Sequence, residues 1–276
     1  MNNSKYSIQE VSSDKNILFN YIQDLNNKIK ENKSISIYEL IEYARLICSG
    51  LPTIEEIKKL ENEKNIKDKG LTGKILEYAL FGQKPNSYNT PDLSKLDTDI
   101  KSCVFKDTKK GKNAKERQTI TNCGNTNNYN TFQNIIENEN FKNCNYYNKC
   151  RKCILIIRNH DKKIFKTFNE LLNQKLSFII YFDIEKLPIE MINIINEDYK
   201  FIRECILKKN VSQKGQKYLH IHPHGAGHGS GNRAFGYTSK FITQVVGYYL
   251  SKIYNENIDN ILNITGRSIT INNDYI

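Results

Sequence analysis

The amino-acid sequence predicts an α/β fold in which a mixed sheet is flanked by helices and preceded by a helical segment. Two observations predict it. Apolar residues recur at helical spacing through the first 65 residues, and from residue 152 onward short apolar runs typical of strands alternate with amphipathic helical patterns. A chain of 276 residues suits one large domain with an accessory segment. We therefore divide it into a helical N-terminal segment, 1–66, and a main domain, 67–276.

The N-terminal segment is expected to be helical throughout. Apolar side chains recur every three or four residues over 14–32 and again over 37–47. Pro52 can begin a further helix over 53–64, because the first turn of a helix does not need the N–H that proline lacks. A fourth helix is predicted over 70–82, at the start of the main domain.

The main domain mixes strands with helices. An extended segment over 98–105 leads into a lysine-rich stretch, 106–115, which we interpret as a basic loop. Residues 126–148 are rich in asparagine and give no clear pattern, and 225–231 is a glycine-rich loop. Further strands are predicted at 118–122, 152–158, 177–183 and 218–223, and long amphipathic helices at 188–208 and 238–254.

Composition narrows the class of protein. The chain has 41 Lys and Arg against 30 Asp and Glu, a formal charge of +11, which favours an acidic partner such as nucleic acid. Part of this excess can also reflect the Asn-, Lys- and Ile-rich composition. The longest apolar runs are too short to cross a bilayer, and residues 1–10 lack the apolar core of a signal peptide. We therefore expect a bacterial-type cytoplasmic protein with no membrane partner.

An acid and a lysine alternate in the extended segment after residue 97. Asp99 and Lys101 are two residues apart, so a strand projects both from one face, and Asp92 lies just upstream. Carboxylates and a backbone carbonyl, here that of Ile100, are oxygen ligands of the kind that hard divalent cations prefer. Glu77, on the shoulder of the preceding helix's apolar face, is a fourth candidate, because a carboxylate turned inward needs a partner.

This pattern suits phosphodiester hydrolysis. Lys101 would orient or deprotonate the attacking water, or stabilise the charge that develops on the phosphate. The alternative is a hairpin in which Asp92 is a turn residue and Lys101 is solvated.

Over a longer stretch the same residues resemble a known family. The run from Lys69 to Glu77, then Pro91-Asp92 and Asp99-Ile100-Lys101, resembles the motif of the MutH-like endonucleases, which include a mismatch-repair nicking enzyme and related type II restriction enzymes. The resemblance implies a PD-(D/E)xK restriction-endonuclease-like core.

The resemblance also implies roles for the four side chains. Glu77, Asp92 and Asp99 would hold Mg²⁺, for which Mn²⁺ can substitute, and Lys101 would be the catalytic lysine. The chain departs from the family by having Asp99 where glutamate is common, although either acid occurs in the wider nuclease signature.

A second group of residues is expected to contact DNA. The segments 115–117, 218–225 and 237–242 resemble parts of the same family, in which the second segment runs into a DNA-contacting loop. Histidines alternate along it toward the glycine-rich loop, whose backbone can approach a phosphate closely. The alternatives are packed, solvated or metal-binding histidines, and a merely solvated lysine-rich stretch. The DNA-binding candidates are Lys109, Lys112, Lys115, Arg117, His222, His224, His228, Arg233, Tyr237 and Lys240, with His220 beginning the alternation.

The cysteines offer a weaker signal. Cys144, Cys150 and Cys153 fall within ten residues, and Cys123 is a conceivable fourth ligand. Structural zinc sites need two close pairs and only one is present, so structural zinc is not expected, and Cys153 can simply be buried in a strand.

Together these observations predict a type II site-specific restriction endonuclease that hydrolyses both strands of double-stranded DNA with magnesium-activated water. One core carries one group of acids, so cutting both strands requires a homodimer or two successive nicks, and we expect the homodimer, with a monomer as the alternative. A cognate DNA methyltransferase encoded nearby is expected. The alternatives are a MutH-type mismatch-repair nicking endonuclease that needs a partner protein, a non-catalytic basic DNA-binding module, and a zinc-dependent binding protein.

Overall fold

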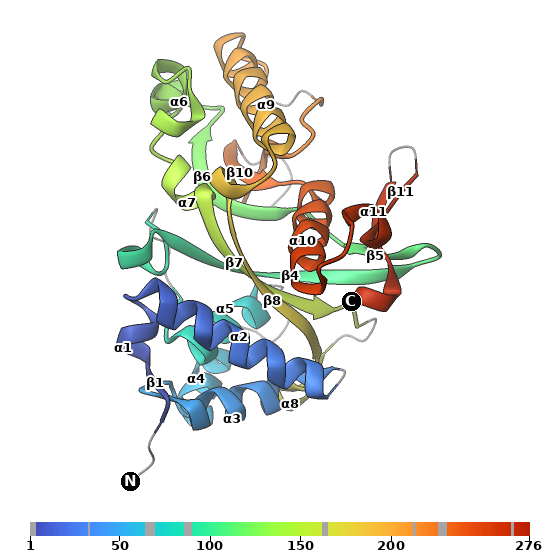
Figure 1. Cartoon of the computed structure of the whole chain (residues 1–276). Coiled ribbons are helices and arrows are strands. Elements are labelled where there is room, and N and C mark those ends of the chain that lie inside the picture. The colour runs from blue at the N-terminus through green and yellow to red at the C-terminus, as the bar shows by residue number, and fades with distance from the viewer. Residues whose placement is uncertain are drawn as a thin grey trace. The chain divides into compact units, whose positions relative to one another are not determined.

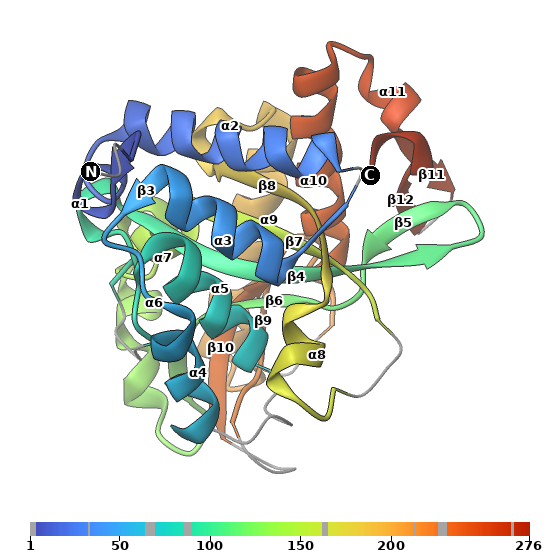
Figure 2. The same ribbon diagram turned by 90° about the horizontal axis from the view of Figure 1, so that it is seen from below.

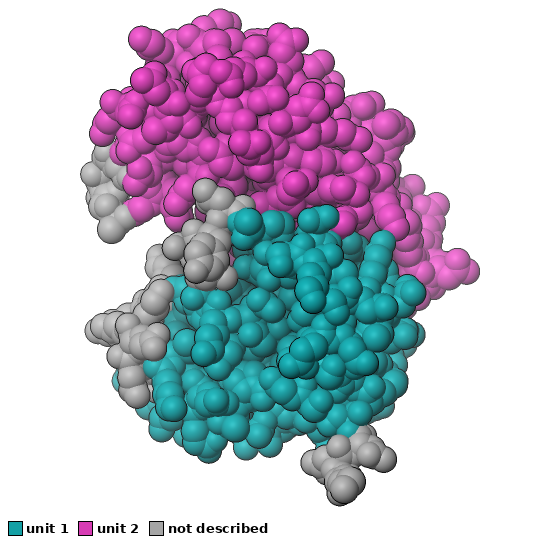
Figure 3. Space-filling model, turned by 90° about the vertical axis from the view of Figure 1, so that its left-hand side faces the viewer, with its two compact units in different colours: residues 1–106, 154–181, 276 teal, residues 107–153, 182–275 magenta. Residues whose placement is uncertain are grey.

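A computed structural model of the chain describes residues 4–32, 34–63, 70–85, 90–161, 165–211, 214–225, 231–265 and 268–276. The chain divides into two compact units, coloured separately in Figure 3: unit 1 contains residues 1–106, 154–181 and 276, and unit 2 contains residues 107–153 and 182–275. The division predicted between residues 66 and 67 falls outside the described residues and stays a prediction. Within the described part of the chain, no helix is long and apolar enough to cross a membrane.

The predicted α/β class is confirmed. A seven-stranded sheet has the order β11-β12-β5-β4-β7-β8-β2, and helices flank it. A separate three-stranded sheet has the order β6-β10-β9.

The described part of unit 1 opens with five helices. Four of them agree with the predicted helices to within a residue or two at each end, and the short helix Ile8–Val11 has no predicted counterpart. Side-chain hydrogen bonds cap the N-termini of two of these helices. The Asp14 carboxylate accepts the N–H groups of Asn16 and Ile17. The Ser36 hydroxyl accepts the N–H of Glu39, and the Glu39 carboxylate accepts the N–H of Ser36. The helices are α1 (Ile8–Val11), α2 (Lys15–Glu31), α3 (Ile37–Ile47), α4 (Ile54–Glu63) and α5 (Leu71–Phe81) (Figures 1 and 2). Two short parallel strands, β1 (Tyr6–Ser7) and β3 (Cys48–Ser49), are an addition to the helical prediction.

The strands of unit 1 lie against these helices. Three long strands are neighbours in the sheet, namely β4 (Thr98–Thr108), β7 (Lys152–Asn159) and β8 (Lys175–Asp183), with β2 (Ile35–Ser36) at the edge and α8 (Phe168–Leu172) between β7 and β8 in sequence. One buried apolar cluster contains Leu18 and Tyr21 of α2, Leu76 of α5, Ile100 of β4 and Ile154 of β7. The N-terminal helices therefore share a single core with the sheet strands of unit 1.

The three-stranded sheet of unit 2 is antiparallel. It consists of β6 (Gln118–Asn125), β10 (Asn232–Tyr237) and β9 (Leu219–Pro223), and its register places Gly236 opposite His220 and Ala234 opposite His222. The central strand β10 has no counterpart in the sequence prediction, whereas β6 and β9 were predicted. Two long helices, α9 (Ile189–Leu207) and α10 (Ser239–Tyr254), confirm the predictions for those segments.

The prediction of a basic loop over residues 106–115 is wrong. Strand β4 continues to Thr108 and pairs within a hairpin with β5 (Gly111–Ala114), so only the tip is a turn. The carbonyl of Lys110 accepts hydrogen bonds from Asn263 Nδ2 at 3.0 Å and Thr270 Oγ1 at 2.9 Å, on β11 (Leu262–Thr265) and β12 (Ser268–Ile271). Gly111 has a φ of 126°, and a side chain there would overlap the Ile271 carbonyl. The partners that make this stretch a strand lie about 150 residues away, so no local pattern predicts them.

The asparagine-rich stretch and the connections form short helices. These are α6 (Gln133–Glu137), α7 (Tyr147–Arg151) and α11 (Ile258–Ile261), with 3₁₀ turns η1 (Ser94–Leu96), η2 (Tyr129–Phe132), η3 (Phe141–Asn143), η4 (Ile184–Lys186) and η5 (Asn273–Tyr275).

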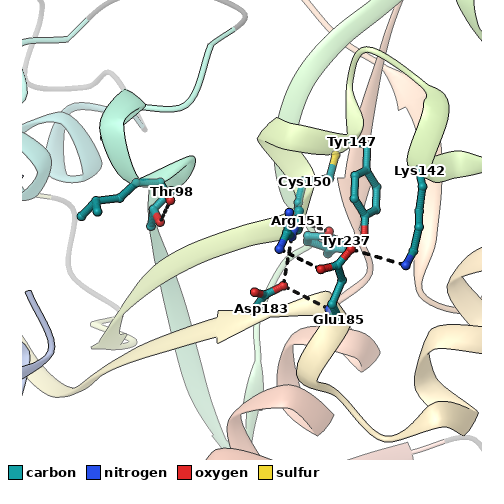
Figure 4. A network of polar contacts seen from close by, with 9 residues as sticks. Thr98, Lys142, Tyr147, Cys150, Arg151, Asp183, Glu185 and Tyr237 are labelled. Atoms are coloured by element: carbon teal, nitrogen blue, oxygen red, sulfur yellow. Dashed lines mark hydrogen bonds and ion pairs between the residues drawn. The ribbon is translucent and has the colours of Figure 1, made fainter. Parts of the chain in front are cut away.

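A polar network fixes α7 to the end of β8 inside unit 2 (Figure 4). Arg151 pairs with Glu185 at 2.7 Å and with the buried Asp183 at 3.4 Å, and Glu185 also accepts from Tyr147 at 3.2 Å and pairs with Lys142 at 3.4 Å. Because one arginine faces two acids and a tyrosine hydroxyl, the buried Asp183 carboxylate is compensated, and the network is structural.

Candidate active site

A tight turn brings the predicted acids of unit 1 together. Leu93 and Thr98 exchange two backbone hydrogen bonds across η1, with the N–H of Leu93 reaching the Thr98 carbonyl at 2.9 Å and the reverse bond at 3.2 Å. This folds the chain back so that Asp92 lies beside strand β4. The Asp92 carboxylate then accepts the backbone N–H of Ile100 at 2.9 Å. The turn therefore converts a separation of seven residues between Asp92 and Asp99 into spatial proximity.

The ammonium group of Lys101 lies among three oxygen groups. Its Nζ is 2.5 Å from Asp99 Oδ2 and 3.8 Å from Asp92 Oδ2, and it donates to the Ile100 carbonyl at 3.0 Å. Asp99 is 0% exposed, and the side chains of Lys101 and Asp92 are only 15% and 10% exposed. An isolated carboxylate at such a depth would be very costly, so the ammonium is needed to compensate it. The structure thus joins Asp92, Asp99, Ile100 and Lys101, as the sequence analysis expects.

Glu77 on α5 is within electrostatic reach of this group. Its pKa is raised to about 7, chiefly by burial and also by the Asp92 and Asp99 carboxylates, while the Lys101 ammonium acts in the opposite direction. Near neutral pH the Glu77 carboxyl is therefore partly protonated, because adding a third negative charge to this buried group is unfavourable.

The donor set fits a hard divalent cation. The three groups that Lys101 contacts, two carboxylates and a carbonyl, are the oxygen ligands that the sequence analysis assigns to Mg²⁺, and Glu77 can add a fourth. Among the residues that the structure describes, no group of three or more His, Cys, Asp or Glu side chains is already arranged around one point as a metal site. The lysine ammonium thus contacts the same oxygens that a bound cation would use.

The predicted DNA-contacting residues all belong to unit 2. Lys112 pairs with Asp107 at 4.0 Å, Arg233 is buried, and His228 lies outside the described residues. The exposed candidates are Lys109, Lys115, Arg117, His224 and Lys240.

The contact with DNA expected of Tyr237 does not agree with its position. Its ring is 1% exposed and packs on Phe182 and Phe241, and its hydroxyl donates to the Cys150 carbonyl at 2.6 Å. Because the ring is enclosed, neither of its faces can stack on a base. Tyr237 is therefore a core residue whose hydroxyl is hydrogen-bonded inside the protein.

Two histidines of β9 form a stacked pair that the sequence analysis recognises only as an alternation. The rings of His220 and His222 lie 4.6 Å apart at 19°, and His222, which is 3% exposed, shares a 3.0 Å hydrogen bond between its Nε2 and Thr119 Oγ1. Gly236 makes room for them, since a Cβ there would fall 2.9 Å from His222 and 3.2 Å from His220.

Both members of the pair are kept neutral. The pKa of His220 is lowered to about 4 and that of His222 to about 3, chiefly by burial and in part by the positive charge of Arg117. The buried Nε2 atom of His220 and Nδ1 atom of His222 have no hydrogen-bond partner among the residues that the structure describes. His220, which was not among the DNA-binding candidates, therefore shares the environment of His222, and its only sequence signal was the alternation itself.

The cysteines of the predicted cluster are buried. Burial raises the thiol pKa of Cys123 and of Cys144, so both remain protonated in the structure.

Comparison with known proteins places this geometry in a family. Residues 81–198 match the family model described as DNA mismatch repair enzyme MutH, a segment that contains Asp92, Asp99 and Lys101 and begins after Glu77. A search of curated proteins finds no match. The predicted resemblance is confirmed over residues 81–198, which are similar to the MutH-like endonucleases of the PD-(D/E)xK nuclease superfamily, a family of enzymes that act on DNA.

Proposed function

We propose that the protein is a type II site-specific restriction endonuclease that hydrolyses phosphodiester bonds of double-stranded DNA. The observation that carries the proposal is the contact of the buried Lys101 ammonium with Asp92, Asp99 and the Ile100 carbonyl. The MutH-like region and the charge of +11 support it, because a cutting enzyme needs carboxylates for a metal and cations for its substrate.

The residues of the acidic group have two different roles, metal binding and proton donation. Asp92, Asp99 and the Ile100 carbonyl, with Glu77 once it is deprotonated, would hold Mg²⁺ or Mn²⁺. When bound, the cation neutralises the charge that develops on the phosphate and lowers the pKa of a water molecule. Lys101, held by the buried Asp99, places a proton donor at Nζ, where it orients the attacking water or stabilises the phosphate oxygens.

The exposed cations of unit 2 would hold the DNA backbone. Lys109, Lys115, Arg117 and Lys240 are free to approach phosphates, and His224 follows the strand that carries the histidine pair. The rings of His220 and His222 are neutral and their unpaired nitrogens are buried, so we assign the pair an indirect part in DNA recognition, in which it positions the strand that leads to the exposed His224. Lys112 and Arg233 would support these contacts.

Three further proposals accompany this function. A single acidic group in each chain favours a homodimer on the DNA. Restriction requires protection of the host DNA, so a cognate methyltransferase would be encoded nearby. Both activities belong in the cytoplasm of a bacterial-type cell.

Digestion of supercoiled plasmid tests the proposal. Purified protein with Mg²⁺ should convert the plasmid to linear DNA with defined ends, and Asp99→Asn should abolish cleavage while DNA binding in Ca²⁺ persists. Asp97→Asn is the matched control, because Asp97 is an exposed acid in the same turn with a φ of 50°, which asparagine tolerates, and it should cut like the wild type. Equal cleavage by wild type and Asp99→Asn would refute the catalytic assignment.

A second candidate is a mismatch-repair nicking endonuclease that needs a partner protein. The description of the matched family favours it directly, since the family model is that of a mismatch repair enzyme. The plasmid assay separates the two: a nicked circle, or no cutting without an added partner, supports the nicking enzyme. DNA binding with no cleavage in any divalent metal would instead support a non-catalytic DNA-binding module.

A further inference from the structure

A chain of side-chain hydrogen bonds crosses unit 1 beside the acidic group. Arg158 on β7 donates from Nε to Ser102 Oγ at 2.7 Å and from Nη1 to Gln174 Oε1 at 2.6 Å. The Gln174 amide then donates to Thr72 Oγ1 at 3.4 Å and to the Leu171 carbonyl at 3.2 Å. One guanidinium is thereby connected to β4 directly and to α5 through a single buried glutamine.

The two elements that Arg158 connects are those that carry the acidic group. Ser102 is the residue after Lys101 on β4, and Thr72 is on α5 five residues before Glu77. The helix lies directly on the strand at this point, since a Cβ on Gly73 would be 3.8 Å from Ser102 Cβ. Gly73 and Glu77 are four residues apart, so the face of α5 that meets β4 is also the face that presents Glu77.

Arginine suits this place for a geometric reason. Its planar guanidinium directs Nε–H and Nη1–H at fixed angles, so the positions of Ser102 and Gln174 are set relative to each other. A lysine ammonium could reach one of these acceptors but would not hold both in one plane. Hydrogen bonds to a charged donor are also stronger than neutral ones, which makes the link stiff.

We propose that Arg158 is a positioning residue that sets the separation between Glu77 on α5 and the Asp99–Lys101 strand. Its described hydrogen bonds go to Ser102 and Gln174, and it acts through these two residues and Thr72. The inference rests on the proposed function, since it assigns to that site the residue that aligns its two halves. Groups of this kind behind a metal site typically change metal affinity or activity by about 10–100-fold when removed.

The test measures Mn²⁺ binding by calorimetry without DNA, beside cleavage, DNA affinity in Ca²⁺ and thermal unfolding. Arg158→Ala should weaken Mn²⁺ binding and lower the cleavage rate by about tenfold each, with DNA affinity unchanged within about twofold. Ser102→Ala removes one branch only and should give a smaller loss in the same direction. Arg158→Lys should recover part of the loss.

Asn26→Ala is the matched structural control in the same unit. Asn26 joins α2 to β8 by two hydrogen bonds, of 2.7 and 2.8 Å to the carbonyl and N–H of Ile179, and these bonds involve neither α5 nor β4. It should lower the unfolding temperature without changing Mn²⁺ affinity. If Asn26→Ala weakens Mn²⁺ binding as much as Arg158→Ala does, or if Arg158→Ala and Ser102→Ala bind Mn²⁺ like the wild type, Arg158 has no positioning role.

The two levels of the proposal can fail separately. A wild type that binds Mn²⁺ but cuts no DNA, with Arg158→Ala and Ser102→Ala weakened as expected, overturns the proposed function and retains the positioning role. A wild type that binds no Mn²⁺ overturns both, since there is then no site to align. If Arg158→Ala does not fold, Ser102→Ala and Arg158→Lys decide the question.

Discussion

The acidic group of unit 1 and the histidine pair of unit 2 both bury titratable side chains, but they handle charge in opposite ways. In the acidic group, two carboxylates and an ammonium are buried together, and Lys101 contacts both Asp92 and Asp99. In the histidine pair, burial removes the charge altogether, and the pKa values of His220 and His222 fall to about 4 and about 3. Charges are compensated in one region and suppressed in the other.

This difference separates two kinds of recognition. A group of buried oxygens that already surrounds an ammonium is suited to exchange that cation for another, as a metal-dependent nuclease requires. In the neutral imidazole pair, the two ring nitrogens that lack a partner among the described residues are buried, so the pair can act on DNA only by positioning the exposed residues that follow it.

The largest effect is expected from Lys101→Ala. Loss of the ammonium should lower the rate of plasmid cleavage by about 10²–10⁴-fold, the usual contribution of a proton donor or acceptor in the transition state. At the same time Ca²⁺ affinity, measured by calorimetry, should increase, because no internal cation then competes for Asp92 and Asp99. Lys95→Ala, an exposed lysine of the neighbouring turn, should change neither quantity. Weaker Ca²⁺ binding by Lys101→Ala would show that the lysine supports the metal site and does not compete with it.

The two regions should also impose opposite pH dependences on the stability of the metal-free protein. Glu77 has a folded-state pKa of about 7, above its unfolded value of 4.5. Its contribution to the free energy of unfolding is therefore lost as pH rises from 4.5 toward 7. The histidines have folded-state pKa values below 6.5, so their contribution to the free energy of unfolding is lost as pH falls from 6.5 toward 4. Each group can add a slope of at most about 1.4 kcal/mol per pH unit.

Urea unfolding from pH 4 to 8 measures these slopes. Glu77→Gln should make stability rise more steeply with pH between 4.5 and 6.5, because the histidine contribution is then unopposed. The double variant His220→Gln, His222→Gln should make stability fall more steeply as pH rises over the same range. Parallel curves for all three proteins would mean that neither region shifts its pKa values on folding.

The smallest effect is expected from Thr119→Val. It removes the one hydrogen bond found for the ring of His222, so stability should fall by about 1–2 kcal/mol, the cost of leaving a buried polar group unpaired. The midpoint of urea unfolding measures this change. Metal affinity should remain that of the wild type, because Thr119 belongs to unit 2 and the acidic group to unit 1. An increase in stability would show that the hydroxyl does not serve the histidine.

The local sequence determined a large part of this protein. Amphipathic spacing and capping residues such as Asp14 and Ser36 encode their helices within a few residues, since helix formation depends on neighbours three and four positions away. The alternation of Asp99 and Lys101 likewise predicted their common face, because a strand repeats every two residues. The turn that brings the Asp92 carboxylate to the N–H of Ile100 completed that group, and these two residues are only eight positions apart in the sequence.

Only the tertiary structure decided the features that depend on distant partners. The lysine-rich stretch forms a hairpin that β12 pairs with and that Asn263 and Thr270 hydrogen-bond. Tyr237 is a core residue because it packs on Phe182 and donates to the Cys150 carbonyl. Arg158 is significant because it donates to Ser102 and Gln174. The raised pKa of Glu77 and the lowered values of the histidines follow from burial, which no short stretch of sequence specifies. Periodicity is a local property of the chain, whereas burial and hydrogen-bond partners arise when segments far apart in sequence pack together.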